Sequence, residues 1–250
     1  MKAIMFIVAT LAIGAAAVIA IAGPGTRLGF WDYGTGLTIM RSMKLPAIAV
    51  AGLAFVSFFI ALFKARGLAA LMFVAAAAAG GAAIVPVKFE QLVDANPFIH
   101  DITTDFDNPP QIVAGSALPR KNPAEYAGKE MAPHSDLTIA EAQKKAFPDI
   151  RPTVVNLRVE KAVKHVRTIL EEMNMDILQE GSSGARSTIE AAYTSMWFGF
   201  TDDFVVRLIS EGERTRVDVR SKSRVGVSDL GANAHRISDF FSKLQARLAS

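Results

Sequence analysis

Residues 204–223 read FVVRLISEGERTRVDVRSKS, and this stretch decides the fold of the C-terminal part of the chain. Residues 204–209 are mostly apolar and β-branched, residues 211–213 form a Glu-Gly-Glu turn signal, and residues 214–223 alternate charged and apolar side chains. Alternation with a period of two is typical of a β-strand that has one covered face. The stretch therefore predicts an antiparallel hairpin whose valines face a core.

The segments on either side of this hairpin predict further strands and two helices. Expected strands are residues 153–157, 176–180 and 187–198, with loops or turns at 181–184 and at Asp202-Asp203. Apolar residues recur at helical spacing in 158–174 and 232–248. The order β, α, four mostly antiparallel β, α predicts an α+β domain at 153–250, an antiparallel sheet with helices packed on one face.

Residues 88–152 are rich in proline, with eight of the 11 prolines of the chain between Pro97 and Pro152. Each proline removes a backbone donor and restricts the residue before it to extended conformations. We expect an extended arm over the surface of the domain. One short helix is predicted within it, because Thr138 and Glu141 form a capping box and Pro148 ends the pattern.

The first 87 residues predict a membrane domain with three transmembrane helices. Three uncharged stretches cover 3–26, 45–63 and 67–87, and each is close to the roughly 20 residues that cross a bilayer core of roughly 30 Å. A cleaved signal peptide is the alternative for the first stretch. The loop at 23–44 is expected to lie along the membrane interface, with a turn at Gly34-Thr35-Gly36.

The distribution of charge excludes some functions and suggests a location. Residues 1–87 hold six Lys/Arg and one Asp, so the surplus of positive charge lies beside the apolar segments and predicts no nucleic-acid partner. The chain has no cysteine, which excludes disulfides, thiol catalysis and cysteine-bound zinc. Lys64 and Arg66 in the connection between two spans favour that side as cytoplasmic. We therefore expect a multi-pass protein of the inner (cytoplasmic) membrane with a periplasmic C-terminal domain.

A cluster of donors near the last helix suggests a binding site for an anion. Every charged residue in 214–224 is even-numbered, so these side chains share one face of the strand. A Gly-rich turn into a helix N-terminus follows, and such ends attract anions. The candidate ligand-binding residues for a phosphate, a carboxylate or an anionic lipid headgroup are Arg220, Ser221, Ser223, Arg224, Ser228, Asn233 and Arg236.

Two other interpretations of this cluster remain open. The charged face of the strand could be a solvated outer surface. Alternatively, its arginines could pair inside the protein with nearby acids, which would make a structural network without a ligand. The acids within reach along the sequence are Asp202, Asp203, Asp218 and Asp229.

A second candidate site comprises His100, Asp101 and Asp105 in the arm, which could supply one nitrogen and two oxygens to a metal. Ordinary turn formation before Pro109-Pro110 is the alternative. A metal-dependent hydrolase built on these residues and a scaffold that docks partner proteins through the arm are the rival functions. No nucleophile elbow, phosphate loop, dinucleotide fingerprint or zinc-protease helix occurs, so we assign no catalytic residue, cofactor or metal and expect a non-enzymatic protein.

Several blocks of the sequence resemble the uncharacterised bacterial family catalogued as domain of unknown function 1499. These blocks are IHDITTD at 99–105 followed by Pro109-Pro110, WFGFTDD at 197–203, DVRSKSRVG at 218–226 and DLGANAHRI at 229–237. RLGFWD at 27–32 is similar to the membrane-embedded members. The resemblance implies an envelope protein with this domain, and it supplies no established catalytic residues.

Overall fold

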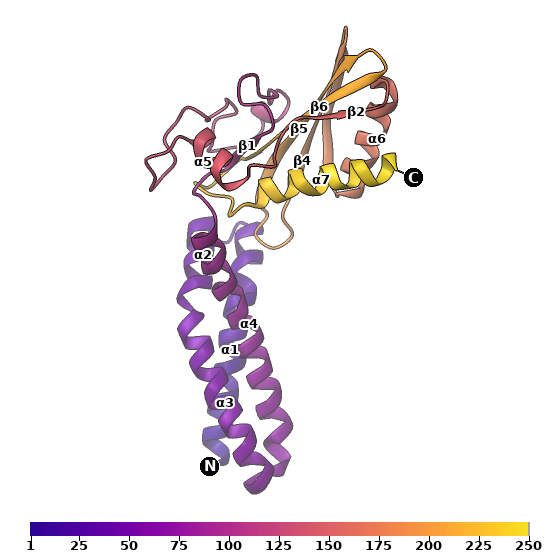
Figure 1. Ribbon diagram of the computed structural model, residues 1–250. Coiled ribbons are helices and arrows are strands. Elements are labelled where there is room, and N and C mark those ends of the chain that lie inside the picture. Colours follow the sequence, from indigo (N-terminus) through magenta and orange to yellow (C-terminus); the bar gives the residue numbers. More distant parts are fainter. Residues whose placement is uncertain (250) are drawn as a thin grey trace. The chain divides into compact units, whose positions relative to one another are not determined.

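The structure, a computed structural model, describes residues 1–249 and divides them into two compact units (Figure 1). The first unit comprises Met1–Leu92 together with Met196–Gly199, and the second comprises Val93–Ser195 and the chain from Phe200 onwards. The first is helical, and the second contains an antiparallel sheet with helices. The predicted α+β class with an N-terminal set of three long apolar helices is confirmed.

Three helices of the first unit are long and apolar enough to cross a membrane. They are α1 (Lys2–Arg27), α3 (Lys44–Lys64) and α4 (Ala69–Ala95), and a short 3-10 turn, η1 (Arg66–Leu68), connects the last two. Alanines make up most of the buried cluster of this unit, which also includes Met5 and Met72. Small side chains allow helix backbones to approach closely, so these helices pack through close contact of their backbones and not through large apolar side chains.

The loop predicted at 23–44 is largely helical, so that part of the prediction was wrong. Helix α1 continues to Arg27, and α2 (Tyr33–Ser42) begins after Asp32, whose carboxylate accepts the backbone N–H groups of Gly34 and Thr35. The two glycines hid the helical signal, although this cap satisfies the first turn. Gly36 is needed for close packing on α1, because a Cβ there would lie 2.2 Å from Thr26 Oγ1.

The segment Met196–Gly199 packs against α1 within the first unit. Trp197 Nε1 donates to the carbonyl oxygen of Ala20 at 3.2 Å, and Arg27 Nη1 donates to that of Met196 at 2.6 Å. Gly23 leaves room for the indole, because a Cβ at this position would lie 2.6 Å from the Trp197 ring. The tryptophan is therefore seated on α1 by shape and by one hydrogen bond.

Six antiparallel strands form the sheet of the second unit. They are β1 (Asp101–Thr103), β2 (Thr153–Val155), β3 (Asp176–Ser183), β4 (Arg186–Thr194), β5 (Thr201–Glu211) and β6 (Arg214–Ser223). Their order is β1-β6-β5-β4-β3, and β2 also pairs with β6. The predicted hairpin is present, with Glu211 opposite Arg214 across a turn at Gly212.

Helices α6 (Val159–Glu172) and α7 (Ala232–Leu248) pack on the sheet and share its hydrophobic core. Val217 and Val219 lie in this core, as the alternation predicts. The short helix α5 (Ile139–Ala146) begins with the predicted capping box of Thr138 and Glu141 and stops before Pro148. The sheet therefore has one apolar face, which α6 and α7 cover, and an opposite face that carries the charged residues of β6.

Three local predictions were wrong because tertiary contacts override the turn signals. Asp202 and Asp203 lie inside β5, where arginines neutralise both carboxylates, and the turn lies before them at Gly199 with φ +72°. Strand β3 continues to Ser183, so only Gly184 and Ala185 form the turn. The arm also contains β1, which pairs with β6 despite the surrounding prolines.

Candidate functional site

The face of the sheet opposite α6 and α7 carries the charged residues of β6, and the arm covers it. Arg220 is 0% exposed and Lys222 is 1% exposed, which corrects the interpretation of this face as a solvated surface. The strand alternation is as predicted, but the segment between β1 and α5 lies over the charged side chains. These charges therefore lie between two layers of protein.

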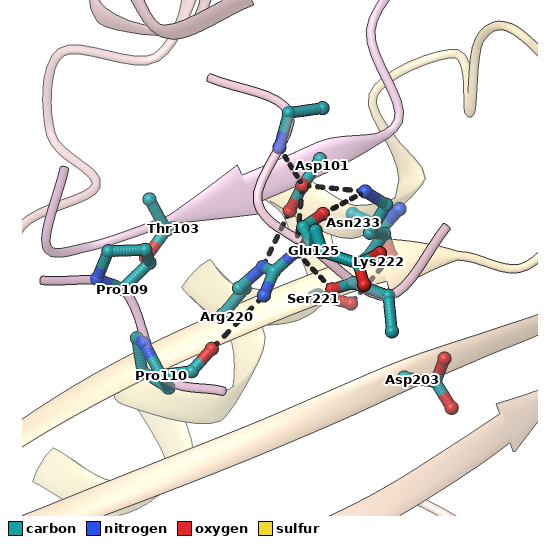
Figure 2. A network of polar contacts seen from close by, with 12 residues as sticks. Asp101, Thr103, Pro109, Pro110, Glu125, Asp203, Arg220, Ser221, Lys222 and Asn233 are labelled. Atoms are coloured by element: carbon teal, nitrogen blue, oxygen red, sulfur yellow. Dashed lines mark hydrogen bonds and ion pairs between the residues drawn. The ribbon is translucent and has the colours of Figure 1, made fainter. Parts of the chain in front are cut away.

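Asp101 is the centre of the most buried ion-pair cluster (Figure 2). Arg220 donates to both of its carboxylate oxygens, at 2.8 Å from Nε and 2.9 Å from Nη2, and Lys222 Nζ lies 3.0 Å from Oδ2. Burial opposes ionisation of Asp101, but the hydrogen bonds and charge of Arg220 outweigh it, and its pKa lies below the ordinary value. Burial lowers the pKa of Lys222 even though Asp101 favours the charged form.

Two further ion-pair clusters join the arm to the same face. Asp203 accepts from Arg224 Nη2 at 2.7 Å and from Arg120 Nη1 at 2.8 Å. In the other cluster, two arginines share two aspartates at 2.9–3.0 Å, and its members are Arg207, Arg216, Asp105 and Asp218. Buried pairs of this kind make the fit of the arm specific, although their net stabilisation is modest after desolvation.

Four of the predicted ligand-binding residues come together on the other face, beside the start of α7. Asn233 Oδ1 accepts from Ser221 Oγ at 2.5 Å and from Arg236 Nη1 at 2.6 Å, and Asn233 Nδ2 donates to Ser223 Oγ at 2.9 Å. Arg236 also pairs with Asp202 at 2.9 Å. This group is closed by hydrogen bonds among its own members.

The structure thus divides the predicted anion-binding set between the two faces of the sheet. Arg220 and Arg224 lie under the arm, whereas Ser221, Ser223, Asn233 and Arg236 lie beside α7. Ser228 is separate, and its hydroxyl accepts from the Leu230 N–H at 3.2 Å. Neighbours along a strand point to opposite faces, so a cluster in sequence does not become a cluster in space.

The three arginines of the predicted anion site pair with acids inside the protein. This agrees in part with the alternative prediction of a structural ion-pair network without a ligand. Arg224 pairs with Asp203 and Arg236 with Asp202, whereas Arg220 pairs with the more distant Asp101. Asp218 binds Arg207 and Arg216. Asp229 instead accepts the N–H groups of Gly231 and Asn233 at the beginning of α7.

The second predicted set, His100, Asp101 and Asp105, is also divided. Asp101 binds Arg220 and Lys222, whereas Asp105 belongs to the cluster of Arg207. Nδ1 of His100 is buried without a hydrogen-bond partner among residues 1–249, and burial together with the charge of Lys222 lowers the pKa of this histidine. Over the same residues, no group of three His, Cys, Asp or Glu side chains is placed to hold a metal ion.

A cleft of about 340 Å³ lies between the arm and the β3–β4 hairpin. One wall is arm residues 108–113, and the floor is the arm-facing side of the two strands. Three cross-strand pairs form this floor: Gln179 with Glu190, Gly181 with Thr188, and Ser183 with Arg186. Gly181 leaves the floor open, because a Cβ there would meet no atom within 4 Å.

Two buried side chains hold the wall of the cleft in place. The Glu190 carboxylate accepts the backbone N–H groups of Val113, Ala114 and Gly115 at 2.9, 2.9 and 2.6 Å. At the other end, Arg207 Nη1 donates to the carbonyl oxygen of Asn108 at 2.7 Å. Bonds to charged groups are the stronger class of hydrogen bond, so the wall is preformed.

The floor of the cleft presents polar side chains that no other part of the protein uses. Within residues 1–249, the side chains of Gln179, Ser183, Arg186 and Thr188 make no hydrogen bond or ion pair with the protein. They supply one guanidinium, one amide and two hydroxyls. The sequence signal for this site was the Gly-Ser-Ser-Gly run before Arg186, which was interpreted only as a loop.

Comparison with known families identifies the domain. The sequence profile described as "Protein of unknown function (DUF1499)" matches residues 101–244. A comparison with curated proteins gives no match. The matched region is more than half of the chain, and it includes the sheet, the cleft and all three ion-pair clusters. The chain therefore belongs to the DUF1499 family of proteins of unknown function.

Proposed function

We propose that this protein is a multi-pass protein of the inner membrane whose exported α+β domain binds an anionic ligand. The ligand is a carboxylate or a phosphate, and an anionic lipid headgroup carries the same chemistry. Three helices of sufficient length and hydropathy support the membrane anchor. The binding site is the cleft between residues 108–113 and the β3–β4 hairpin.

Arg186 is the observation that carries this proposal. It lines the cleft, is exposed, and has no acidic partner among residues 1–249, whereas Arg220, Arg224 and Arg236 are each paired with an aspartate. A guanidinium can donate two parallel hydrogen bonds to a carboxylate or phosphate. The neighbouring hydroxyls of Ser183 and Thr188 can donate to the remaining oxygens.

The cleft is better suited to binding than to catalysis. Its carboxylate, Glu190, already accepts three backbone N–H groups, and its arginines supply only N–H donors. General acid–base catalysis needs a group that exchanges a proton near neutral pH. A metal-dependent hydrolase on His100, Asp101 and Asp105 has less support, since Asp101 and Asp105 serve different ion-pair clusters.

Native mass spectrometry of the detergent-extracted protein tests this proposal, with inorganic phosphate and acetate added as probes. The wild type should retain an anionic adduct, either co-purified or added. Arg186→Gln removes the cation, and Gly181→Leu adds an apolar side chain to the floor, at a position where nothing lies within 4 Å of the added Cβ. Arg186→Gln should weaken binding by about tenfold to a hundredfold, as expected for the loss of one charge-assisted contact. Gly181→Leu should also weaken binding, because its side chain takes up space in the cleft.

Arg214→Gln is the matched control, since Arg214 is an exposed arginine of β6 that does not line the cleft. This variant should retain the wild-type adduct. Melting temperatures of all three variants should stay within a few degrees of the parent, because none of the three side chains is buried. Binding that is equally strong in all variants would place the anion elsewhere and contradict the proposal.

A further inference from the structure

Strand β3 is an open edge of the sheet. It ends the strand order β1-β6-β5-β4-β3, and its outer side has no strand partner among residues 1–249. Residues 179–183 are all exposed. Their register with β4 is regular over five pairs, and the only irregularity lies before them, between Ile177 and Gln179. A five-residue edge of this kind can accept another strand.

The chemistry of this edge does not prevent strand addition. Native proteins commonly protect edges with lysine, proline or a bulge inside the exposed stretch. Residues 179–183 read QEGSS and contain neither lysine nor proline. The charge of Glu180 is paired with Arg167 at 2.6 Å, on the side that carries α6. The backbone of residues 179–183 is therefore open to a partner strand.

Two clefts flank this one edge, and both are lined in part by Gly181, Ser182 and Thr188; the larger extends toward the arm and the smaller toward Val163 of α6. The larger, of about 340 Å³, is lined by Gln179, Gly181 and Ser183 on the arm side. The smaller, of about 200 Å³, is lined by Glu180 and Ser182 of the edge together with Val163 of α6. Side chains of an added strand alternate between the two faces, so successive residues would enter the two clefts in turn.

Arg186 indicates that a strand added at this edge would carry a negative charge. It lies directly opposite Ser183 at the end of the edge and is exposed, and no acid of residues 1–249 neutralises it. A carboxylate on the incoming strand matches this position. A lipid headgroup would use Arg186 as well, but it would leave the edge backbone and the smaller cleft unused.

We propose that the anionic ligand of the cleft is an extended peptide segment of a partner protein, which adds beside β3 as a further strand and places a carboxylate on Arg186. This inference rests on the proposed anion binding in the cleft. Main-chain hydrogen bonds to residues 179–183 align the peptide with β3, and the two clefts determine which peptide side chains fit. The ion pair with Arg186 fixes the register and direction of the peptide.

The test uses the full-length protein in detergent and a library of random octapeptides with amidated C-termini, each made once with Asp and Glu and once with Asn and Gln in their place. Binding is followed by hydrogen exchange of the β3 amides. Members with a carboxylate should slow exchange at residues 179–183 by about tenfold or more, because a paired amide opens less often. Arg186→Gln should remove the preference for the carboxylate form.

Two substitutions at Gly181 separate edge pairing from damage to the fold. Gly181→Glu places a negative charge in the larger cleft, where it repels the incoming carboxylate, and should abolish peptide binding. Gly181→Ala adds one methyl group into open space and should preserve it. Failure of every peptide to slow exchange at β3 would overturn the inference, and so would equal binding by the glutamate variant.

The outcomes also distinguish this inference from the proposed function. If phosphate or vesicles of phosphatidylglycerol bind in an Arg186-dependent way while no peptide does, the anion site stands and the peptide inference is overturned. If neither anions nor peptides bind, both the proposed anion binding and the peptide inference are overturned. If the β3 amides become protected as protein concentration rises without peptide, the occupant is a second copy of the chain, and the peptide inference is overturned.

Discussion

Arg220 is fully buried, which is rare for arginine unless its guanidinium is completely paired. Its donors reach both oxygens of Asp101 and the carbonyl oxygens of Pro110, Ala124 and Glu125. It also lies over the ring of Tyr126, 5.4 Å from the centroid. A single side chain thus joins β6 to β1 and to two parts of the arm.

Asp101→Ala should be strongly destabilising, because it leaves the buried charges of Arg220 and Lys222 without an acid. Removing one partner of a buried pair costs about 3–5 kcal/mol. Chemical denaturation of the full-length protein, followed by a signal from the sheet, measures this loss. Asp136→Ala is the control, because Asp136 is exposed and should change stability by no more than about 0.5 kcal/mol. Equal stability of the two variants would contradict a structural role for Asp101.

Asp229 should make the free energy of unfolding depend on pH in the opposite sense to Asp101. Burial raises its pKa to about 6, from an ordinary value of 3.8, although the N–H groups of Gly231 and Asn233 at the beginning of α7 favour the carboxylate. The folded state therefore holds the proton more tightly, and this stabilisation is complete below pH 3.8 and lost as the pH rises through about 6. Asp101, whose pKa is lowered, contributes in the other direction and only at lower pH.

The measurement compares melting temperatures of the wild type and Asp229→Asn between pH 4 and 7. The wild type should lose stability relative to the variant as the pH rises across this range, because asparagine has no proton to release. Melting curves that stay parallel would show that Asp229 titrates at its ordinary pKa in the folded protein.

At the scale of elements, shape and hydrogen bonding decide where the segment Met196–Gly199 lies. The indole N–H of Trp197 donates to the Ala20 carbonyl oxygen. The indole ring occupies space that is free only because Gly23 has no side chain. Trp197 is followed by Phe198, and the two rings pack edge to face at 4.9 Å. The seat on α1 therefore depends on a glycine as much as on the aromatic residues.

Gly23→Ala should displace Trp197, since the new methyl group would lie 2.6 Å from the ring. In a Trp31→Phe background Trp197 is the sole tryptophan, so its emission maximum and its quenching by iodide report the displacement. Both should change relative to the parent. Gly14→Ala lies in the same helix with nothing within 4 Å of the added Cβ and should leave the emission unchanged. Identical spectra for both variants would show that the indole does not depend on Gly23.

At the scale of the whole molecule, we expect Lys64 at the end of α3 and Arg66 in η1 to set the sidedness of the C-terminal domain. Cationic residues in short connections remain on the cytoplasmic side. Because the chain passes from this connection through α4 alone to the domain, we expect the domain on the opposite side.

A fusion of alkaline phosphatase to the C-terminus should therefore be active, because this enzyme matures only after export. Replacing both cations, as in Lys64→Glu with Arg66→Glu, should reduce the activity of the fusion by weakening the orientation signal. An inactive fusion together with a fluorescent cytoplasmic reporter at the same position would place the domain in the cytoplasm.

The local features of this protein follow from its sequence alone. The length and hydropathy of α1, α3 and α4, the β5–β6 hairpin and the capping box of α5 depend on neighbours in the chain. The strand period in 214–223 correctly separates the core valines from the charged residues. Propensity, capping and periodicity are short-range effects, so a single sequence is sufficient to predict them.

The tertiary structure alone decides which charges are buried and which groups stay unpaired. Asp101 and Arg220 are 119 residues apart, and their pairing requires the arm to fold over the sheet. In the same packing, the arginines of the predicted anion site form ion pairs with aspartates of the protein. Arg186, which follows a run that was interpreted only as a loop, instead lines a cleft. Ion pairing and burial depend on long-range contacts, so the sequence could name candidate partners for the arginines but not decide which pairs form or which side chains are buried.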